Sequence, residues 1–157
     1  MDNVIIDDET ILHSGVRVLE NVMIGKNVIC NSNVVIGSDG FSFVSDTGEG
    51  IEKVMLARSD DVKMNLNNYL KIESLGSVEI HDNVEIGANS TIDRGSIGDT
   101  EINDFCMIDN IVHLGHNVKL GQKCVIAAMT GISGSTTIGN NVMIGCLLYT
   151  SDAADEE

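Results

Sequence analysis

The sequence predicts an all-β protein built as a parallel β-helix of six-residue repeats. Three observations support this prediction: an apolar residue recurs at every sixth position, a β-branched residue lies two positions before it, and a glycine or another small or polar residue often follows it. An amphipathic helix would space its apolar residues three and four apart, and a simple strand would alternate every two residues without a regular turn. A short strand that ends at a corner accounts for all three observations.

The repeat runs through three stretches, which begin at Ile6, Ile80 and Ile102. Their 17 hexads have inward-pointing residues predicted at Ile6, Leu12, Val18, Ile24, Cys30, Ile36, Ile80, Ile86, Ile92, Ile102, Ile108, Leu114, Leu120, Ile126, Ile132, Ile138 and Ile144. Three hexads make one triangular coil, so the chain should form between five and six coils stacked about 4.8 Å apart.

Composition agrees with a narrow core and excludes several functions. Hydrophobic residues make up 43% of the 157, but there are only 3 Phe, 2 Tyr and no Trp, and proline is absent. The net charge of −15 argues against binding to nucleic acid or to an anionic membrane surface. No apolar run approaches the ~20 residues of a membrane-spanning helix, and no signal peptide opens the chain. We therefore expect a cytoplasmic protein with no membrane span.

Two interruptions and a tail divide the chain. We expect residues 1–145 to form the β-helix, with one long inserted loop at 38–77 and a shorter interruption at 93–100. Residues 146–157 show no hexad and look like translated sequencing-adapter DNA, so we interpret them as a non-native tail. A disordered acidic tail is the alternative.

The period also makes a prediction about cysteines. Cys106 and Cys124 lie 18 residues apart, so they should point inward on successive coils. A disulfide is geometrically conceivable, but two buried thiols are expected in a reducing compartment.

The candidate catalytic residues are His116, Asp109 and Gly134. His116 lies two places after the inward Leu114, so it should point outward near a corner, and Gly134 should occupy the same place one coil further on. Asp109 could reach across the corner to orient the imidazole. A base beside a free backbone N–H suits acyl transfer, because the N–H can hold the oxyanion of the tetrahedral intermediate.

Simpler interpretations stay open for each of these residues. A histidine on a solenoid face is often only a surface residue, Asp109 could be a solvated turn carboxylate, and Gly134 could be needed for its backbone angles. His113 and His116 have a spacing that suggests metal binding, but no further histidine completes a site, and we expect no metal.

Several ordered motifs carry a family resemblance over about residues 12–145. They occupy residues 36–43, 84–95 (with IGANSTIDRG), 108–110 (IDN), 115–118 (GHNV) and 131–136. Together they resemble the UDP-3-O-acylglucosamine N-acyltransferase family of lipid A biosynthesis, and the long first loop resembles its alphaproteobacterial branch.

This resemblance implies a left-handed β-helix and a specific reaction. The family transfers a (3-hydroxy)acyl chain from acyl carrier protein to the 2-amino group of a UDP-sugar lipid precursor, UDP-3-O-acylglucosamine. It implies that His116 is the general base, that Asp109 pairs with it, and that Gly134 supplies the oxyanion N–H. It further implies a homotrimer with active sites between subunits, and no cofactor of the enzyme's own.

The chain departs from the family at both ends. The uridine-binding domain that precedes the β-helix and the last coils and helices that follow it have no counterpart here, so we expect a truncated copy that lacks the uridine and carrier-protein contacts. Another hexapeptide-repeat acyltransferase, acting on a hydroxyl or using acetyl-CoA, is one alternative function. A non-catalytic β-solenoid is the other.

Overall fold

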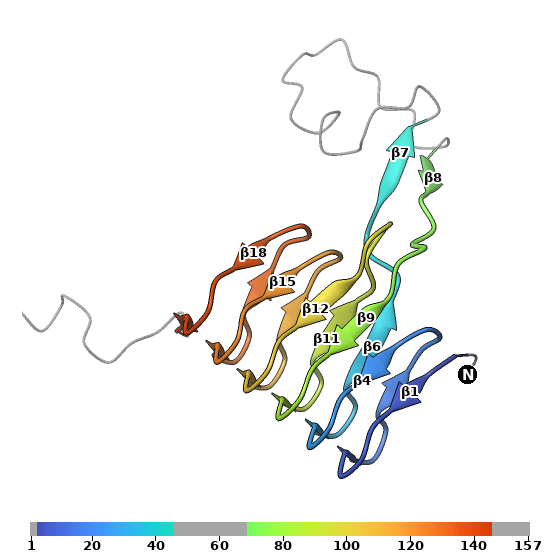
Figure 1. Ribbon diagram of the computed structural model, residues 1–157. Helices are drawn as coiled ribbons and strands as arrows, with labels where there is room; N and C mark the ends of the chain where they lie inside the picture. Colours follow the sequence, from blue (N-terminus) through green and yellow to red (C-terminus); the bar gives the residue numbers. More distant parts are fainter. Residues whose placement is uncertain (1–2, 46–68, 146–157) are drawn as a thin grey trace, which may run out of the picture.

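The chain forms a left-handed parallel β-helix, as the sequence and the family resemblance predict. A computed structural model describes residues 3–45 and 69–145, and within these ranges the secondary structure consists of strands without helices. Figure 1 shows the coils stacked side by side from β1 to β18, with the hairpin of β7 and β8 projecting from one edge. The described part of the chain has no helix long and apolar enough to cross a membrane.

Three parallel sheets form the sides of the prism. Sheet A contains β1 (Ile5–Ile6), β4 (Met23–Ile24), β9 (Val78–Ile80), β12 (Thr100–Ile102), β15 (Lys119–Leu120) and β18 (Thr137–Ile138). Sheet B contains β2 (Ile11–Leu12), β5 (Ile29–Cys30), β10 (Glu85–Ile86), β13 (Met107–Ile108), β16 (Val125–Ile126) and β19 (Met143–Ile144). Sheet C contains β3 (Arg17–Val18), β6 (Val35–Ser38), β11 (Thr91–Asp93), β14 (His113–Leu114) and β17 (Gly131–Ile132).

All the inward residues predicted from the hexads lie in these strands. Most are fully buried, including Ile36, Ile86 and Leu114 at 0% exposure. Ile6 and Leu12, in the first coil that the structure describes, are exposed. Burying one such side chain contributes roughly 1.5–3 kcal/mol, so the stacked rows are the main source of stability.

The number of residues between paired strands shows how long each interruption is. Paired strands are 18 residues apart in the regular coils, as in Ile5 with Met23. The separation becomes 56 residues across the first interruption and 22 across the second. The extra residues leave the prism after β6 and after β11, at the same edge of the prism, while the pairing of the strands around them is kept.

The first interruption contains strands that the sequence analysis did not predict. β7 (Phe43–Ser45) and β8 (Tyr69–Lys71) pair antiparallel, and the Phe41 and Phe43 rings meet edge to face with centroids 4.9 Å apart. We expected a loop over 38–77. Residues 46–68 of that loop and the predicted tail at 146–157 lie outside the described residues.

Outside the two interruptions, the described turns repeat one left-handed backbone position, six residues apart. Asparagine occupies it most often, as at Asn83, Asn89 and Asn117, each with φ of 59°. Asparagine tolerates this conformation better than other non-glycine residues. Ile111 adopts it as well, with φ of 59°, although a β-branched side chain is poorly suited to it.

Cys106 and Cys124 are free, fully buried thiols on successive coils, which confirms the expectation of thiols and not a disulfide. The Cys106 thiol donates to the carbonyl of Gly121 at 3.0 Å, and the Cys124 thiol donates to that of Gly139 at 3.1 Å. Burial raises the pKa of Cys106 to about 11, so the thiol stays protonated at neutral pH.

Candidate active site

The residue two places after each inward side chain lies at a corner of the prism. After the sheet C strands, this row consists of Glu20, Ser38, Arg94, His116 and Gly134. We call it the sheet-C corner. Both interruptions leave the prism here, so the chemistry-bearing residues and the irregular segments share one edge.

His116 and Gly134 are neighbours on successive coils, as the sequence predicts. β14 pairs with β17 through His113 with Gly131 and Leu114 with Ile132, which aligns position 116 with position 134. The N–H of Ser135 donates to the carbonyl of His116 at 2.7 Å. The side chain of His116 is half-buried and lies outside the prism.

The imidazole lies directly against the backbone of Gly134. A Cβ atom on Gly134 would lie 2.5 Å from Nε2 and 2.7 Å from Cε1 of His116, so no larger residue fits there without displacing the ring. The φ angle of Gly134 is not in the left-handed region. This glycine therefore provides space for the imidazole, and the alternative of a backbone-angle requirement is wrong.

Both interruptions contribute a wall around His116. A Cβ atom on Gly40 would lie 3.0 Å from Cβ and Cδ2 of His116, so the first interruption passes close to the ring. Ser96, from the second interruption, places its Oγ 3.3 Å from Nδ1, and Asn117 places its Oδ1 3.2 Å from the same atom. The second ring nitrogen, Nε2, faces Gly134.

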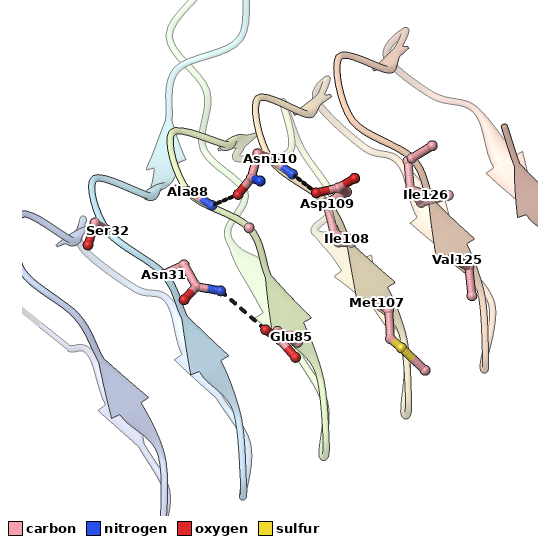
Figure 2. A pocket seen from close by; sticks show the side chains of 12 residues that line it. Asn31, Ser32, Glu85, Ala88, Met107, Ile108, Asp109, Asn110, Val125 and Ile126 are labelled. Atoms are coloured by element: carbon pink, nitrogen blue, oxygen red, sulfur yellow. Dashed lines mark hydrogen bonds between the residues drawn. The ribbon is translucent and has the colours of Figure 1, made fainter. Parts of the chain in front are cut away.

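The structure does not bring Asp109 to His116. Asp109 is exposed at the end of β13 in sheet B, and its Oδ1 accepts the N–H of Asn110 at 2.7 Å. Figure 2 shows it on the rim of a groove of about 600 Å³ over sheet B, beside Asn110 and Met107. The expected reach across the corner within one chain is not seen, because a separation of seven residues carries Asp109 onto the neighbouring side of the prism.

A buried carboxylate that the sequence analysis did not single out lies near His116. Asp93 is 6% exposed; it accepts a hydrogen bond from Ser38 Oγ at 2.7 Å and lies 3.5 Å from Nε2 of His113. Burial raises the pKa of Asp93, against the lowering effects of the Ser38 hydrogen bond and of positive charge on His113 and His116.

Arg94 fixes the segment that carries Ser96. Its buried guanidinium donates to the carbonyl of Gly37 at 2.9 Å and to the carbonyl of Glu20 at 2.7 Å, and it pairs with the Glu20 carboxylate at 3.2 Å. These contacts join three coils of the sheet-C corner. Because these contacts pair the guanidinium of Arg94 with Gly37 and Glu20, we assign it a structural role.

Metal ligation has no support in the described ranges. No group of three or more His, Cys, Asp or Glu side chains there could hold a metal ion. His113 and His116 face different partners, Asp93 and the Asn117–Ser96 pair respectively.

The chain is similar over most of its length to proteins named UDP-3-O-acylglucosamine N-acyltransferase. It is 43% identical over 137 residues to the UDP-3-O-acylglucosamine N-acyltransferase of Hahella chejuensis, covering 87% of this chain and 34% of the relative. It is 42% identical over 111 residues to that of Paracoccus denitrificans, covering 71% of the chain and 30% of the relative. The resemblance to the UDP-3-O-acylglucosamine N-acyltransferase family is thereby confirmed. The chain spans about a third of the length of these acyltransferases.

Solved structures support the fold. A crystal structure of UDP-N-acetylglucosamine acyltransferase superposes with a TM-score of 0.69 at 22% identity, covering 92% of this chain and 47% of that one. The Arabidopsis UDP-N-acetylglucosamine acyltransferase gives a TM-score of 0.54 at 15% identity, with 90% and 57% covered. No protein-family model matches the chain.

Proposed function

We propose that this chain carries part of the active site of an N-acyltransferase of lipid A biosynthesis. The substrates are an acyl carrier protein thioester and UDP-3-O-acylglucosamine, and the product is the amide at the 2-amino group. The main structural support is the contact between the His116 imidazole and the Gly134 backbone on successive coils. The sequence similarity to N-acyltransferases supplies the substrate class.

In this mechanism His116 acts as the general base. The 2-amino nitrogen attacks the thioester carbonyl carbon and forms the C–N bond, and Nε2 of His116 accepts the proton that this nitrogen loses. The carbonyl oxygen becomes an oxyanion, which the N–H of Gly134 stabilises by about 3 kcal/mol. The intermediate collapses, the C–S bond breaks, and the carrier thiolate leaves and takes up a proton.

We further propose that Asp109 acts from a second copy of the chain. The two side chains are on different sides of the prism, so Asp109 can partner the His116 imidazole only across an interface between copies. The homotrimer implied by the family resemblance would supply such an interface. Binding of the carrier protein and the cytoplasmic location remain expectations from the sequence.

The test is His116→Ala in this chain and at the aligned position of the Hahella chejuensis enzyme. Loss of a general base should lower kcat by roughly 10²–10⁴-fold. His81→Ala, at an exposed position following sheet A, is the matched control and should leave activity unchanged. Acyl transfer is measured with acyl carrier protein and with coenzyme A thioesters; undiminished transfer in the His116 variants would refute the assignment, and a preference for acetyl-CoA would favour the alternative acyltransferase.

A further inference from the structure

The two ring nitrogens of His116 have different surroundings, and one of them is held by fixed protein groups. Nδ1 has two oxygen neighbours, Ser96 Oγ at 3.3 Å and Asn117 Oδ1 at 3.2 Å. A serine hydroxyl can donate or accept, so it does not determine which nitrogen carries the proton. An amide oxygen can only accept, so Asn117 can determine it.

The orientation of the Asn117 amide follows from two backbone groups. Its Oδ1 accepts the N–H of Ser96 at 2.9 Å, and its Nδ2 donates to the carbonyl of Gly98 at 2.7 Å. Turning the amide over would set an NH₂ group against an N–H and an oxygen against a carbonyl. The amide oxygen therefore faces Nδ1 of His116.

The backbone of Asn117 is equally restrained. Its φ of 59° belongs to the left-handed turn position, and its own N–H donates to Thr100 Oγ1 at 2.9 Å. Ser96, Gly98 and Thr100 all belong to the second interruption or its immediate end, so this segment holds the amide in place.

From this arrangement we infer that Asn117 is a positioning residue, which holds the neutral His116 imidazole in the tautomer with its proton on Nδ1. An unprotonated Nδ1 would set its lone pair against the amide oxygen. The lone pair is then on Nε2, the ring nitrogen nearest to Gly134, and is available to accept a proton. This inference extends the proposed function by naming the residue that prepares the base.

The tautomer can be measured directly in the full chain. We would label histidine with ¹⁵N, record long-range ¹H–¹⁵N spectra in mildly alkaline buffer where imidazoles are neutral, and assign the His116 signals with His116→Gln. The expected pattern is a protonated Nδ1 and an unprotonated Nε2. Predominance of the Nε2-protonated form in the wild type would overturn the inference, and this result requires no variant to fold.

Two substitutions separate the amide oxygen from a general structural role. Asn117→Gly keeps a residue suited to the left-handed turn and removes the acceptor, so the Nε2-protonated form should increase. Asn117→Asp restores an acceptor and should restore the Nδ1-protonated form. Asn83→Gly is the matched control at the same turn position in another coil. An unchanged tautomer in Asn117→Gly, with the His13 and His81 signals still native, would also refute the inference.

Activity then distinguishes this inference from the proposed function. In the active enzyme Asn117→Gly should lower kcat by roughly ten- to hundred-fold with KM little changed, and Asn117→Asp should recover most of it. If the tautomer is as inferred but His116→Ala keeps full activity, the proposed function fails and the assignment of Asn117 stands. If His116 is essential but its tautomer does not change in Asn117→Gly, the proposed function stands and the assignment of Asn117 fails.

Discussion

The corners after sheet A and after sheet C occupy the same backbone position, but their side chains are used differently. At sheet A this row consists of Asp8, Lys26, Asp82, Asp104, Gln122 and Asn140. Its carboxylates and amides bind the backbone of the preceding coil: Asp82 accepts the N–H of Lys26 at 2.8 Å, and Asp104 accepts that of Asp82 at 3.0 Å. We call this row the sheet-A corner.

These hydrogen bonds between side chains of one coil and backbone N–H groups of the coil before it form a ladder. At the sheet-C corner this ladder is interrupted. The residue that follows His116 in the row is Gly134, which has no side chain to accept the N–H of the coil before it. The space is filled by the imidazole. The same position of the repeat can therefore either join successive coils by hydrogen bonds or carry a reactive side chain. Where the ladder is omitted, at the sheet-C corner, there is room for the imidazole.

The largest effect is expected at Gly134, where a side chain would compete with the imidazole for the same space. Gly134→Ala should push the imidazole away from its place and lower acyl transfer by about a hundred-fold. Gly139→Ala is the matched control, because a Cβ atom there would have no neighbour within 4 Å among the described residues. Steady-state kinetics of both variants test this, and equal activities would show that the close approach of the ring has no catalytic value.

The next effect concerns the ladder itself. Asp104→Ala removes the acceptor for the Asp82 N–H and for Gln122 Nε2, the latter at 3.2 Å, so the free energy of unfolding should fall by about 1–2 kcal/mol. Urea unfolding measures this. Glu79→Ala removes the same charge from a side chain that has no hydrogen bond within the described ranges, and should change stability little. A loss of similar size in both variants would mean that charge, and not the ladder, sets stability.

A smaller effect extends the comparison to the turn after β13 of sheet B, where Ile111 takes the left-handed backbone position. Ile111 is 55% exposed and has φ of 59°, so Ile111→Asn should raise the free energy of unfolding by about 1 kcal/mol. Ile97→Asn, at an 88% exposed residue that is not in the left-handed region, is the control and should give no gain. Thermal unfolding of both variants decides whether backbone strain is the cause.

At the sheet-C corner, the effect of Asp93 on the free energy of unfolding should depend on pH. Because burial raises the pKa of Asp93, the folded state holds its proton more tightly than the unfolded state, and the ionised carboxylate weakens the fold above that pKa. The groups that face it are His113, His116, Asp39 and Ser38. Asp93→Asn should therefore be more stable than the wild type in mildly alkaline buffer.

This advantage should shrink as the pH falls through the raised pKa of Asp93, where the wild-type carboxyl becomes neutral. Urea unfolding across this range measures it. Asp99→Asn, at a half-buried carboxylate that accepts the N–H of Ser77, is the control without the advantage. A constant difference at every pH would exclude Asp93 ionisation as the cause.

Much of the fold was predictable because one period governs it. Every inward residue of the hexads, from Ile6 to Ile144, lies in a strand, and the contact of His116 with Gly134 follows from counting 18 residues. The hairpin of β7 and β8 was not predictable, because its strands are short and far apart in sequence and no hexad marks them. Within the site, asparagine and serine at positions 117 and 96 had no visible role, since a hydrogen bond across two segments leaves no periodic signal.

The within-chain contact expected between Asp109 and His116, which the structure does not show, rests on a different kind of reasoning. Counting along the chain shows which residues are stacked, because coils differ by a constant number of residues. It does not give the distance between neighbouring sides of the prism, which depends on the shape of the turn. Asp109 was assigned by that second kind of reasoning, and Gly134 by the first.

Both insertions begin and end at the same edge, and the strands on either side remain paired, with one register shift between Ile92 and Asp93 where β11 pairs with β6. Lengthening or shortening them therefore need not alter the rise of the β-helix or the stacking of its interior. In such a scaffold the walls around a reactive side chain can be remodelled independently of the core, so substrate preference and folding stability can evolve separately.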